Sequence, residues 1–135
     1  MNEGHLSGKR VLVIEDTAEN MRLFRAVLRL EGAQMLEASN AADGIEIASS
    51  EQPDIILMDI QMAGMDGLEA TRVLRNEPTT CDIPIVAVTA SVMDKDRDKT
   101  REAGCVGHIP KPIDPMTFGS QVAEFLVEKD QVQPS

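Results

Sequence analysis

Five short apolar runs alternate with segments of helical periodicity, and this alternation restricts the fold more than any other feature of the chain. The runs predict strands at residues 10–14, 34–39, 54–58, 83–88 and 106–109. The first, third and fourth are almost continuously apolar, which is typical of strands buried on both faces of a parallel sheet. Right-handed crossovers then place helices on both faces. The pattern predicts a single α/β domain.

The size and charge of the chain restrict its class. It has 135 residues, enough for one domain, which we expect over residues 9–128 with flexible ends at 1–8 and 129–135. The formal net charge of -10 argues against nonspecific binding to nucleic acids or anionic membranes. No apolar run approaches the roughly 18 residues of a membrane span, and residues 1–8 lack the apolar stretch of an export signal. Cys81 and Cys105 belong to no Cys/His cluster, so we expect reduced thiols and a cytoplasmic location.

Polar residues follow four of the predicted strands at the point where each strand ends. The side chains in question are Glu15, Asp16, Asp59, Thr89 and Lys111. Because the carboxyl ends of parallel strands meet at one edge of a sheet, we expect these side chains to lie close together.

The acidic members of this set suggest a metal site. Glu15, Asp16 and Asp59 offer the oxygen ligands that Mg²⁺ prefers, and without a cation they would repel one another. A simpler interpretation of Glu15 and Asp16 is that they cap the following helix.

Asp59 also has the position of a nucleophile, since carboxylates form acyl phosphates in phosphoryl transfer. Thr89 and Lys111 could then hold the oxygens of the transferred group. Lys111 lies between Pro110 and Pro112, so the alternative is an ordinary surface lysine in a turn.

The fourth predicted helix differs from the others because residues 94–102 include no apolar side chain. We expect no buried side chain within it, and therefore low stability and easy displacement. The alternative is a solvated surface helix held by salt bridges.

Five motifs in order resemble the receiver domain of two-component response regulators. They occupy residues 11–16, 55–62, 64–67, 86–90 and 111–112, and the resemblance extends from about residue 9 to residue 128. The first and second motifs further resemble stand-alone, DivK-like receivers and those attached to hybrid kinases. The resemblance implies a flavodoxin-like, doubly wound α/β fold with a five-stranded parallel sheet in the order 2-1-3-4-5 and helices on both faces.

The resemblance also implies roles for the residues at the strand ends. Asp59 would accept the phosphoryl group, and Glu15, Asp16, Asp59 and the backbone carbonyl of Gln61 would bind Mg²⁺. Thr89 and Lys111 would hold the phosphoryl oxygens. The chain would be a slow self-catalyst, and not an enzyme with a free substrate.

The implied partners are proteins. The donor would be a phosphohistidine on a sensor histidine kinase or a histidine phosphotransfer protein, and a downstream protein would bind the switched face. Thr89 and His108 would form the switch, although the family often has Tyr or Phe at the position of His108. The alternative is an exposed histidine without a role. Ala63 also departs from the family, which usually has Pro there, and we expect a less restrained loop.

Three alternatives compete with this interpretation. A Mg²⁺-dependent phosphatase or phosphotransferase could use Asp59 as its nucleophile, but such enzymes usually carry a second Asp where this chain has Gln61. A nucleotide- or flavin-binding domain would need a Gly-rich phosphate loop, which the sequence lacks. A phosphorylation-independent receiver would normally have lost Asp59, Thr89 or Lys111, and the chain retains all of them.

Overall fold

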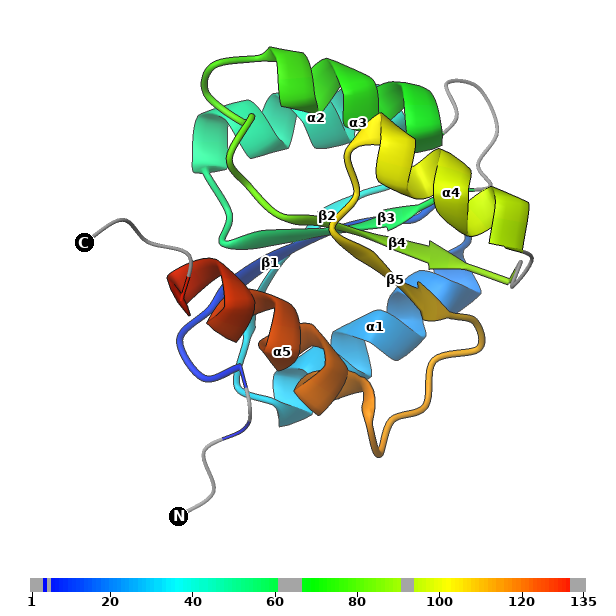
Figure 1. Ribbon diagram of the computed structural model, residues 1–135. Helices are drawn as coiled ribbons and strands as arrows, with labels where there is room; N and C mark the ends of the chain where they lie inside the picture. The colour runs from blue at the N-terminus through cyan, green and yellow to red at the C-terminus, as the bar shows by residue number, and fades with distance from the viewer. Residues whose placement is uncertain (1–3, 5, 61–66, 91–93, 132–135) are drawn as a thin grey trace.

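The computed structural model describes residues 4, 6–60, 67–90 and 94–131, and these form three layers with a sheet between two layers of helices (Figure 1). The sheet has five parallel strands in the order β2-β1-β3-β4-β5. Their bounds are β1 (Arg10–Ile14), β2 (Gln34–Ala38), β3 (Ile55–Asp59), β4 (Ile85–Thr89) and β5 (Gly107–Pro110). The predicted fold and strand order are confirmed.

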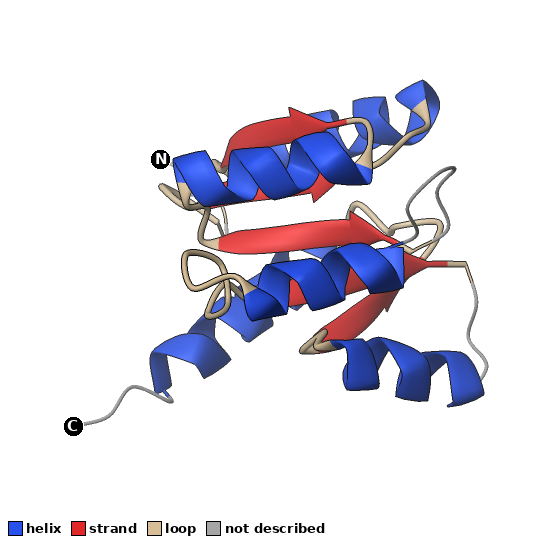
Figure 2. Ribbon diagram, turned by 90° about the horizontal axis from the view of Figure 1, so that it is seen from above, coloured by secondary structure: helices blue, strands red, loops and turns tan. Residues whose placement is uncertain are grey.

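Helices cover both faces of the sheet, as Figure 2 shows from above. One layer contains α1 (Ala18–Leu30) and α5 (Phe118–Gln131), and the other contains α2 (Ala41–Glu51), α3 (Gly67–Asn76) and α4 (Asp94–Ala103). Alternate residues of the strands supply the two cores. In β1, Val11 and Val13 pack with α1 and α5, whereas Leu12 and Ile14 pack with α2 and α3.

Three strands, β3, β4 and β5, end one residue later than predicted. Asp59 and Thr89 are the last residues of β3 and β4, because the hydrogen-bond ladder continues past the apolar run. The Ile60 N–H donates to the Val88 carbonyl at 3.3 Å, and the Lys111 N–H donates to the Thr89 carbonyl at 2.9 Å. Both side chains are therefore fixed by sheet geometry.

The flexible N-terminus predicted for residues 1–8 needs correction at Leu6, which is fully buried. Its N–H donates to the Glu31 carbonyl at 3.1 Å, and its side chain packs in the core with α1 and α5. Burial of one leucine side chain is worth about 2 kcal/mol, which offsets part of the entropy lost by ordering the backbone around it. The core thus begins before the predicted boundary at Lys9.

The last helix begins after a capped turn and extends beyond the predicted end of the domain. Its regular hydrogen bonding begins at Phe118, and the segment after Asp114 forms a turn that the Asp114 carboxylate caps through the Met116 N–H at 2.9 Å. The helix then continues through Gln131, three residues beyond the predicted end of the domain at 128. Phe118 and Val122 are buried, whereas Phe125 is only partly buried.

The prediction that α4 buries none of its own side chains is wrong at Thr100, which is only 6% exposed. The sequence pattern counted apolar residues alone, yet a threonine side chain carries a methyl group that can pack against a core. Ala103 is also buried at the C-terminal end of the helix. Among the described side chains of α4, the buried ones therefore lie in its last turn.

Candidate phosphoryl-acceptor and metal site

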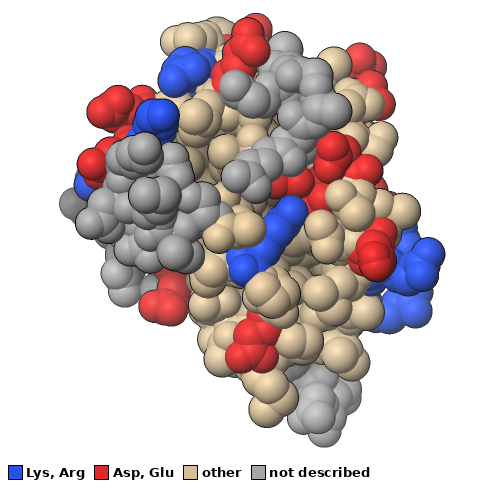
Figure 3. Space-filling model, turned by 90° about the vertical axis from the view of Figure 1, so that its right-hand side faces the viewer, with Lys and Arg blue, Asp and Glu red and all other residues tan. Residues whose placement is uncertain are grey.

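The carboxyl ends of β1 and β3 bring three carboxylates together. One oxygen from each of Glu15, Asp16 and Asp59 lies within 4.8 Å of the others. Glu15 and Asp59 are buried, with exposed fractions of 1% and 4%, whereas Asp16 is exposed. Figure 3 shows this edge of the molecule, where acidic side chains gather beside a basic one.

Lys111 supplies the positive charge of the cluster from the end of β5. Its Nζ lies 3.0 Å from Glu15 Oε1 and 3.2 Å from Asp59 Oδ2. The interpretation of Lys111 as an ordinary surface lysine in a turn is therefore wrong. Burial alone would lower the pKa of Lys111, but the carboxylates of Glu15 and Asp59 outweigh it and raise this pKa above its usual value.

Glu15 reaches Lys111 because other groups hold its second oxygen. Glu15 Oε2 accepts hydrogen bonds from the Thr17 N–H at 3.1 Å and from the Asn20 side-chain amide at 3.4 Å. Sequence reasoning assigned no role to Asn20, although it lies one turn into α1 and faces the acidic pair. The capping interpretation of Glu15 is thus partly correct, since the carboxylate binds an N–H at the start of α1 while its other oxygen faces the cluster.

Thr89 is buried at the end of β4, one residue beyond Val88, which is the register partner of Asp59. Its carbonyl accepts the Lys111 N–H, so the backbone ties together the two residues predicted to hold phosphoryl oxygens. A shift of either strand end must therefore move both residues.

Gly67 allows α3 to begin directly beside the end of β3. A Cβ at this position would lie 2.7 Å from both the Asp59 carbonyl oxygen and the Ile60 Cα, which is too close for any side chain. The Gly67 N–H donates to the Ile60 carbonyl at 3.3 Å. This close approach holds the start of α3 against the backbone of Asp59 and Ile60.

Of the other residues singled out in the sequence, the structure describes His108. Gln61, the predicted source of a carbonyl ligand, and Ala63 lie outside the described residues. His108 is half-buried in β5 as the register partner of Ala87, and therefore lies on the face of the sheet covered by α2, α3 and α4.

The donor set fits a hard divalent cation. All of the converging ligand atoms are carboxylate oxygens, and three carboxylates outnumber the single ammonium of Lys111. Glu15 Oε1 is buried and receives no well-aligned hydrogen bond, in spite of its short distance from Lys111. A cation would supply the missing counter-charge.

Across the described residues, no helix combines the length and the apolar character required to cross a membrane.

Comparison with known proteins gives a family match. Residues 11–123 match the response regulator receiver domain. The polar-differentiation response regulator DivK of Brucella anthropi is 36% identical over 118 residues, which cover 87% of this chain and 96% of that protein.

Solved structures agree with this family match. The receiver domain of a sensor histidine kinase from Pseudomonas aeruginosa, which has a magnesium ion coordinated in its active-site cleft, superimposes with a TM-score of 0.81 at 26% identity. The match covers 90% of this chain and 99% of that one. The chemotaxis protein CheY4 of Vibrio cholerae shares the fold, with a TM-score of 0.82, 21% identity and coverage of 86% and 97%.

Proposed function

The chain belongs to the response regulator receiver family, and we propose that Asp59 is the residue through which it accepts a phosphoryl group in signalling. The observation that carries this assignment is the position of Asp59 Oδ2, buried and 3.2 Å from the Lys111 ammonium at the edge of an acidic cluster. A carboxylate oxygen of Asp59 would bond to phosphorus as the bond from phosphorus to the donor's imidazole nitrogen breaks.

Glu15, Asp16 and Asp59 would hold Mg²⁺, together with the Gln61 carbonyl predicted from the sequence. The metal would supply positive charge to the oxygens of the transferring group. The Lys111 ammonium and the Thr89 hydroxyl would bind those oxygens from the β4–β5 side.

Phosphorylation would change the partners of Lys111. In the unphosphorylated chain its ammonium is shared between Glu15 and Asp59. A phosphoryl group on Asp59 carries more negative charge than the carboxylate it modifies, so it would draw Lys111 away from Glu15. Because Lys111 and Thr89 are joined through their backbones, this displacement would reach β4 and the half-buried His108 in β5. This is the proposed switch.

The donor would be a phosphohistidine of a sensor histidine kinase or a histidine phosphotransfer protein. A hollow of about 200 Å³ lies between α1 and the segment after β5, and Lys111 lines it together with Leu23 and Ile113. The exposed side chains of Leu23, Ala26 and Leu30 continue from it along α1 with helical spacing. Such an apolar stripe suits a helix of the donor protein that delivers its phosphohistidine to Asp59.

The cytoplasmic location stays a prediction from the sequence.

The reaction would be slow and self-catalysed. Each chain would hold its phosphoryl group until water removes it or another protein takes it. The family match does not favour the alternative of a phosphatase or phosphotransferase with a free substrate.

The test is chemical labelling with a small acyl phosphate. With Mg²⁺ we expect one phosphate per chain, attached as an acyl phosphate that hydroxylamine removes and that mass spectrometry maps to Asp59. In EDTA the labelling should disappear. Hydroxylamine-resistant phosphate on Ser or Thr would contradict the proposal, as would full labelling in EDTA.

A further inference from the structure

We infer that Arg75 fixes the C-terminal end of α4, so that the helix moves about this end when Asp59 is phosphorylated. The inference rests on the proposed phosphoryl switch and specifies how it would reach α4.

The Arg75 guanidinium joins three segments at the amino edge of the sheet. Its Nε donates to the Gly104 carbonyl at 2.8 Å, directly after α4. Its Nη1 donates to the carbonyls of Cys81 at 2.8 Å and Ile83 at 2.7 Å, in the segment before β4. Hydrogen bonds from a charged donor are stronger than those between neutral groups. One side chain of α3 thus ties the end of α4 to the start of β4.

Gly104 makes this contact possible. Its φ of +121° belongs to a region that side chains disfavour, and a Cβ there would lie 2.6 Å from Arg75 Cγ. A glycine in the turn after α4 therefore leaves room for the Arg75 side chain.

Buried side chains lie at the C-terminal end of α4. Thr100 and Ala103 in the last turn are buried, and so is Cys105 directly after the helix. The neighbouring side chains of Asp98, Lys99, Arg101 and Glu102 are exposed. The N–H groups of Gly104 and Cys105 both donate to the Thr100 carbonyl, at 3.2 and 3.0 Å, and close the end of the helix.

The geometry of the sheet places this anchor far from the chemistry. Ile83 precedes β4, whereas Thr89 ends it, so Arg75 and the predicted switch residue lie at opposite ends of one strand. The start of α4 follows β4 in the chain and lies toward the Thr89 end of the sheet (Figure 1). A displacement of Thr89 would therefore act on the start of α4, while Arg75 holds its end.

Hydrogen exchange along α4 tests this directly, with beryllium fluoride and Mg²⁺ as the phosphoryl mimic. The first amides of α4 with an acceptor inside the helix are those of residues 98 and 99, which report on its start. In the wild-type chain their exchange rates should change by about fivefold or more, which is the lower range of allosteric coupling, while rates at 101–103 stay constant. In Arg75→Lys, which keeps the charge but cannot form the forked contact, the change should extend through residue 103.

The matched control is Arg72→Lys, at an exposed position one turn earlier on α3. It should reproduce the wild-type pattern. Both variants should be phosphorylated at Asp59 at the wild-type rate, because neither arginine belongs to the acidic cluster.

Each outcome decides the matter. A uniform change along α4 in the wild-type chain would overturn the pivot and leave the switch intact. No change in α4 on a chain fully loaded with the mimic would overturn the proposed switch, and the pivot with it. If Arg75→Lys behaves like Arg72→Lys, then Arg75 is not the anchor. Should Arg75→Lys fail to fold, the pattern in the wild-type chain together with that of Arg75→Gln decides instead.

Discussion

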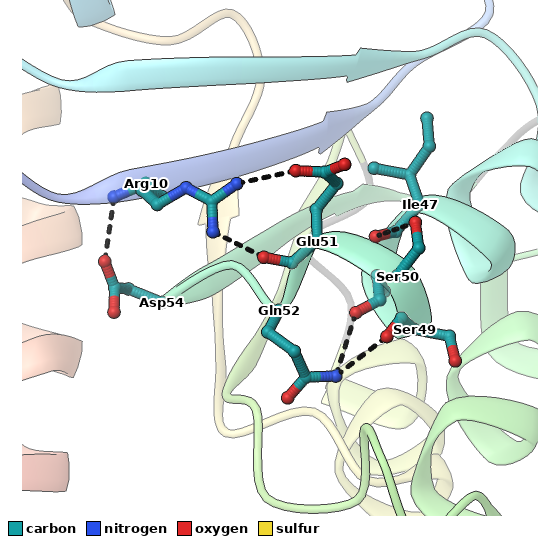
Figure 4. A network of polar contacts seen from close by, with 8 residues as sticks. Arg10, Ile47, Ser49, Ser50, Glu51, Gln52 and Asp54 are labelled. Carbon is teal, nitrogen blue, oxygen red and sulfur yellow. Dashed lines mark hydrogen bonds and ion pairs between the residues drawn. The ribbon is translucent and has the colours of Figure 1, made fainter.

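Two aspartates flank the same central strand, and their surroundings differ. Asp59 ends β3 at the carboxyl edge of the sheet, buried and sharing Lys111 with Glu15. Asp54 precedes β3 at the amino edge, half-buried, and accepts the Arg10 N–H at 2.8 Å. There the Arg10 guanidinium also binds the backbone carbonyl of Glu51 and, at 2.9 Å, its carboxylate (Figure 4).

The difference lies in how charge is compensated. At the amino edge the ion pair of Arg10 and Glu51 is partly exposed, so each charge has water as well as a partner. At the carboxyl edge, buried carboxylates share one ammonium and have little access to water. The amino edge is therefore stable as it stands, whereas the carboxyl edge favours an added cation.

The largest expected effect is a difference in phosphorylation between variants of the two aspartates. Asp59→Asn should abolish labelling by a small acyl phosphate with Mg²⁺, because the nucleophilic oxygen is lost. Asp54→Asn keeps a side-chain oxygen for the Arg10 N–H and should be labelled at the wild-type rate. Mass spectrometry of both variants measures this, and equal labelling of the two would remove the functional distinction between the edges.

The second effect is the loss of stability when the Lys111 or the Arg10 side chain loses its charge in the absence of metal. Lys111→Met leaves Glu15 and Asp59 buried without their cation, and we expect the free energy of unfolding in EDTA to fall by about 3 kcal/mol. Arg10→Met breaks a partly exposed pair and should cost about 1 kcal/mol. Urea denaturation gives both values.

A Mg²⁺ titration then distinguishes Lys111→Met from Arg10→Met by the response of their stabilities to the metal. Mg²⁺ stabilises every chain that keeps the acidic cluster, so each variant is compared with wild type in the same buffer. Saturating Mg²⁺ should narrow the stability deficit of Lys111→Met and leave that of Arg10→Met unchanged. Equal losses that ignore Mg²⁺ would mean that burial does not distinguish these sites.

A third, smaller effect concerns metal affinity. Asp16→Ala removes one oxygen ligand, and we expect Mg²⁺ binding to weaken at least about tenfold, or about 1.4 kcal/mol. The control is Asp43→Ala, which removes an exposed carboxylate from the first turn of α2. Amide chemical shifts followed during a Mg²⁺ titration report both affinities. An unchanged midpoint for Asp16→Ala would exclude Asp16 from the ligands.

The smallest effect tests whether the contribution of a charge to stability depends on its burial or on its position near the carboxyl edge. The test uses an exposed ion pair close to that edge. Arg25 donates two hydrogen bonds of 2.7 Å to Glu37, which lower the pKa of the Glu37 carboxyl. Because this pKa is lower in the folded state, the contribution of Glu37 is present above its unfolded value of 4.5 and is lost as the pH falls through the folded value.

Unfolding of wild type and Glu37→Gln between pH 3 and pH 6, roughly spanning the ordinary range of a Glu pKa, checks the sign. The two curves should differ slightly above pH 4.5 and converge below it. A large difference would show that exposed pairs at this edge are as sensitive as the buried cluster.

The sequence was sufficient to predict much of the site. Asp59 and Lys111 follow apolar runs, and parallel strands end at one edge, so their convergence followed from the pattern alone. The position of Thr89 directly after an apolar run was predicted in the same way, and its role in binding phosphoryl oxygens stays a prediction. Leu6 was missed because a single leucine in a polar segment has no periodicity, and Thr100 because the pattern counted only apolar residues.

The sequence by itself determined the order of strands and helices, the residues that the strand ends bring together, and the negative charge that they share. Only the tertiary structure decided which contacts hold them. The acceptors of Arg75 are backbone carbonyls of Cys81, Ile83 and Gly104, and every residue type carries such a carbonyl. The sharing of Lys111 between Glu15 and Asp59 likewise depends on distances of about 3 Å between atoms from three strands. Periodicity indicates which residues face the core, but partners and distances arise only when separate segments pack together.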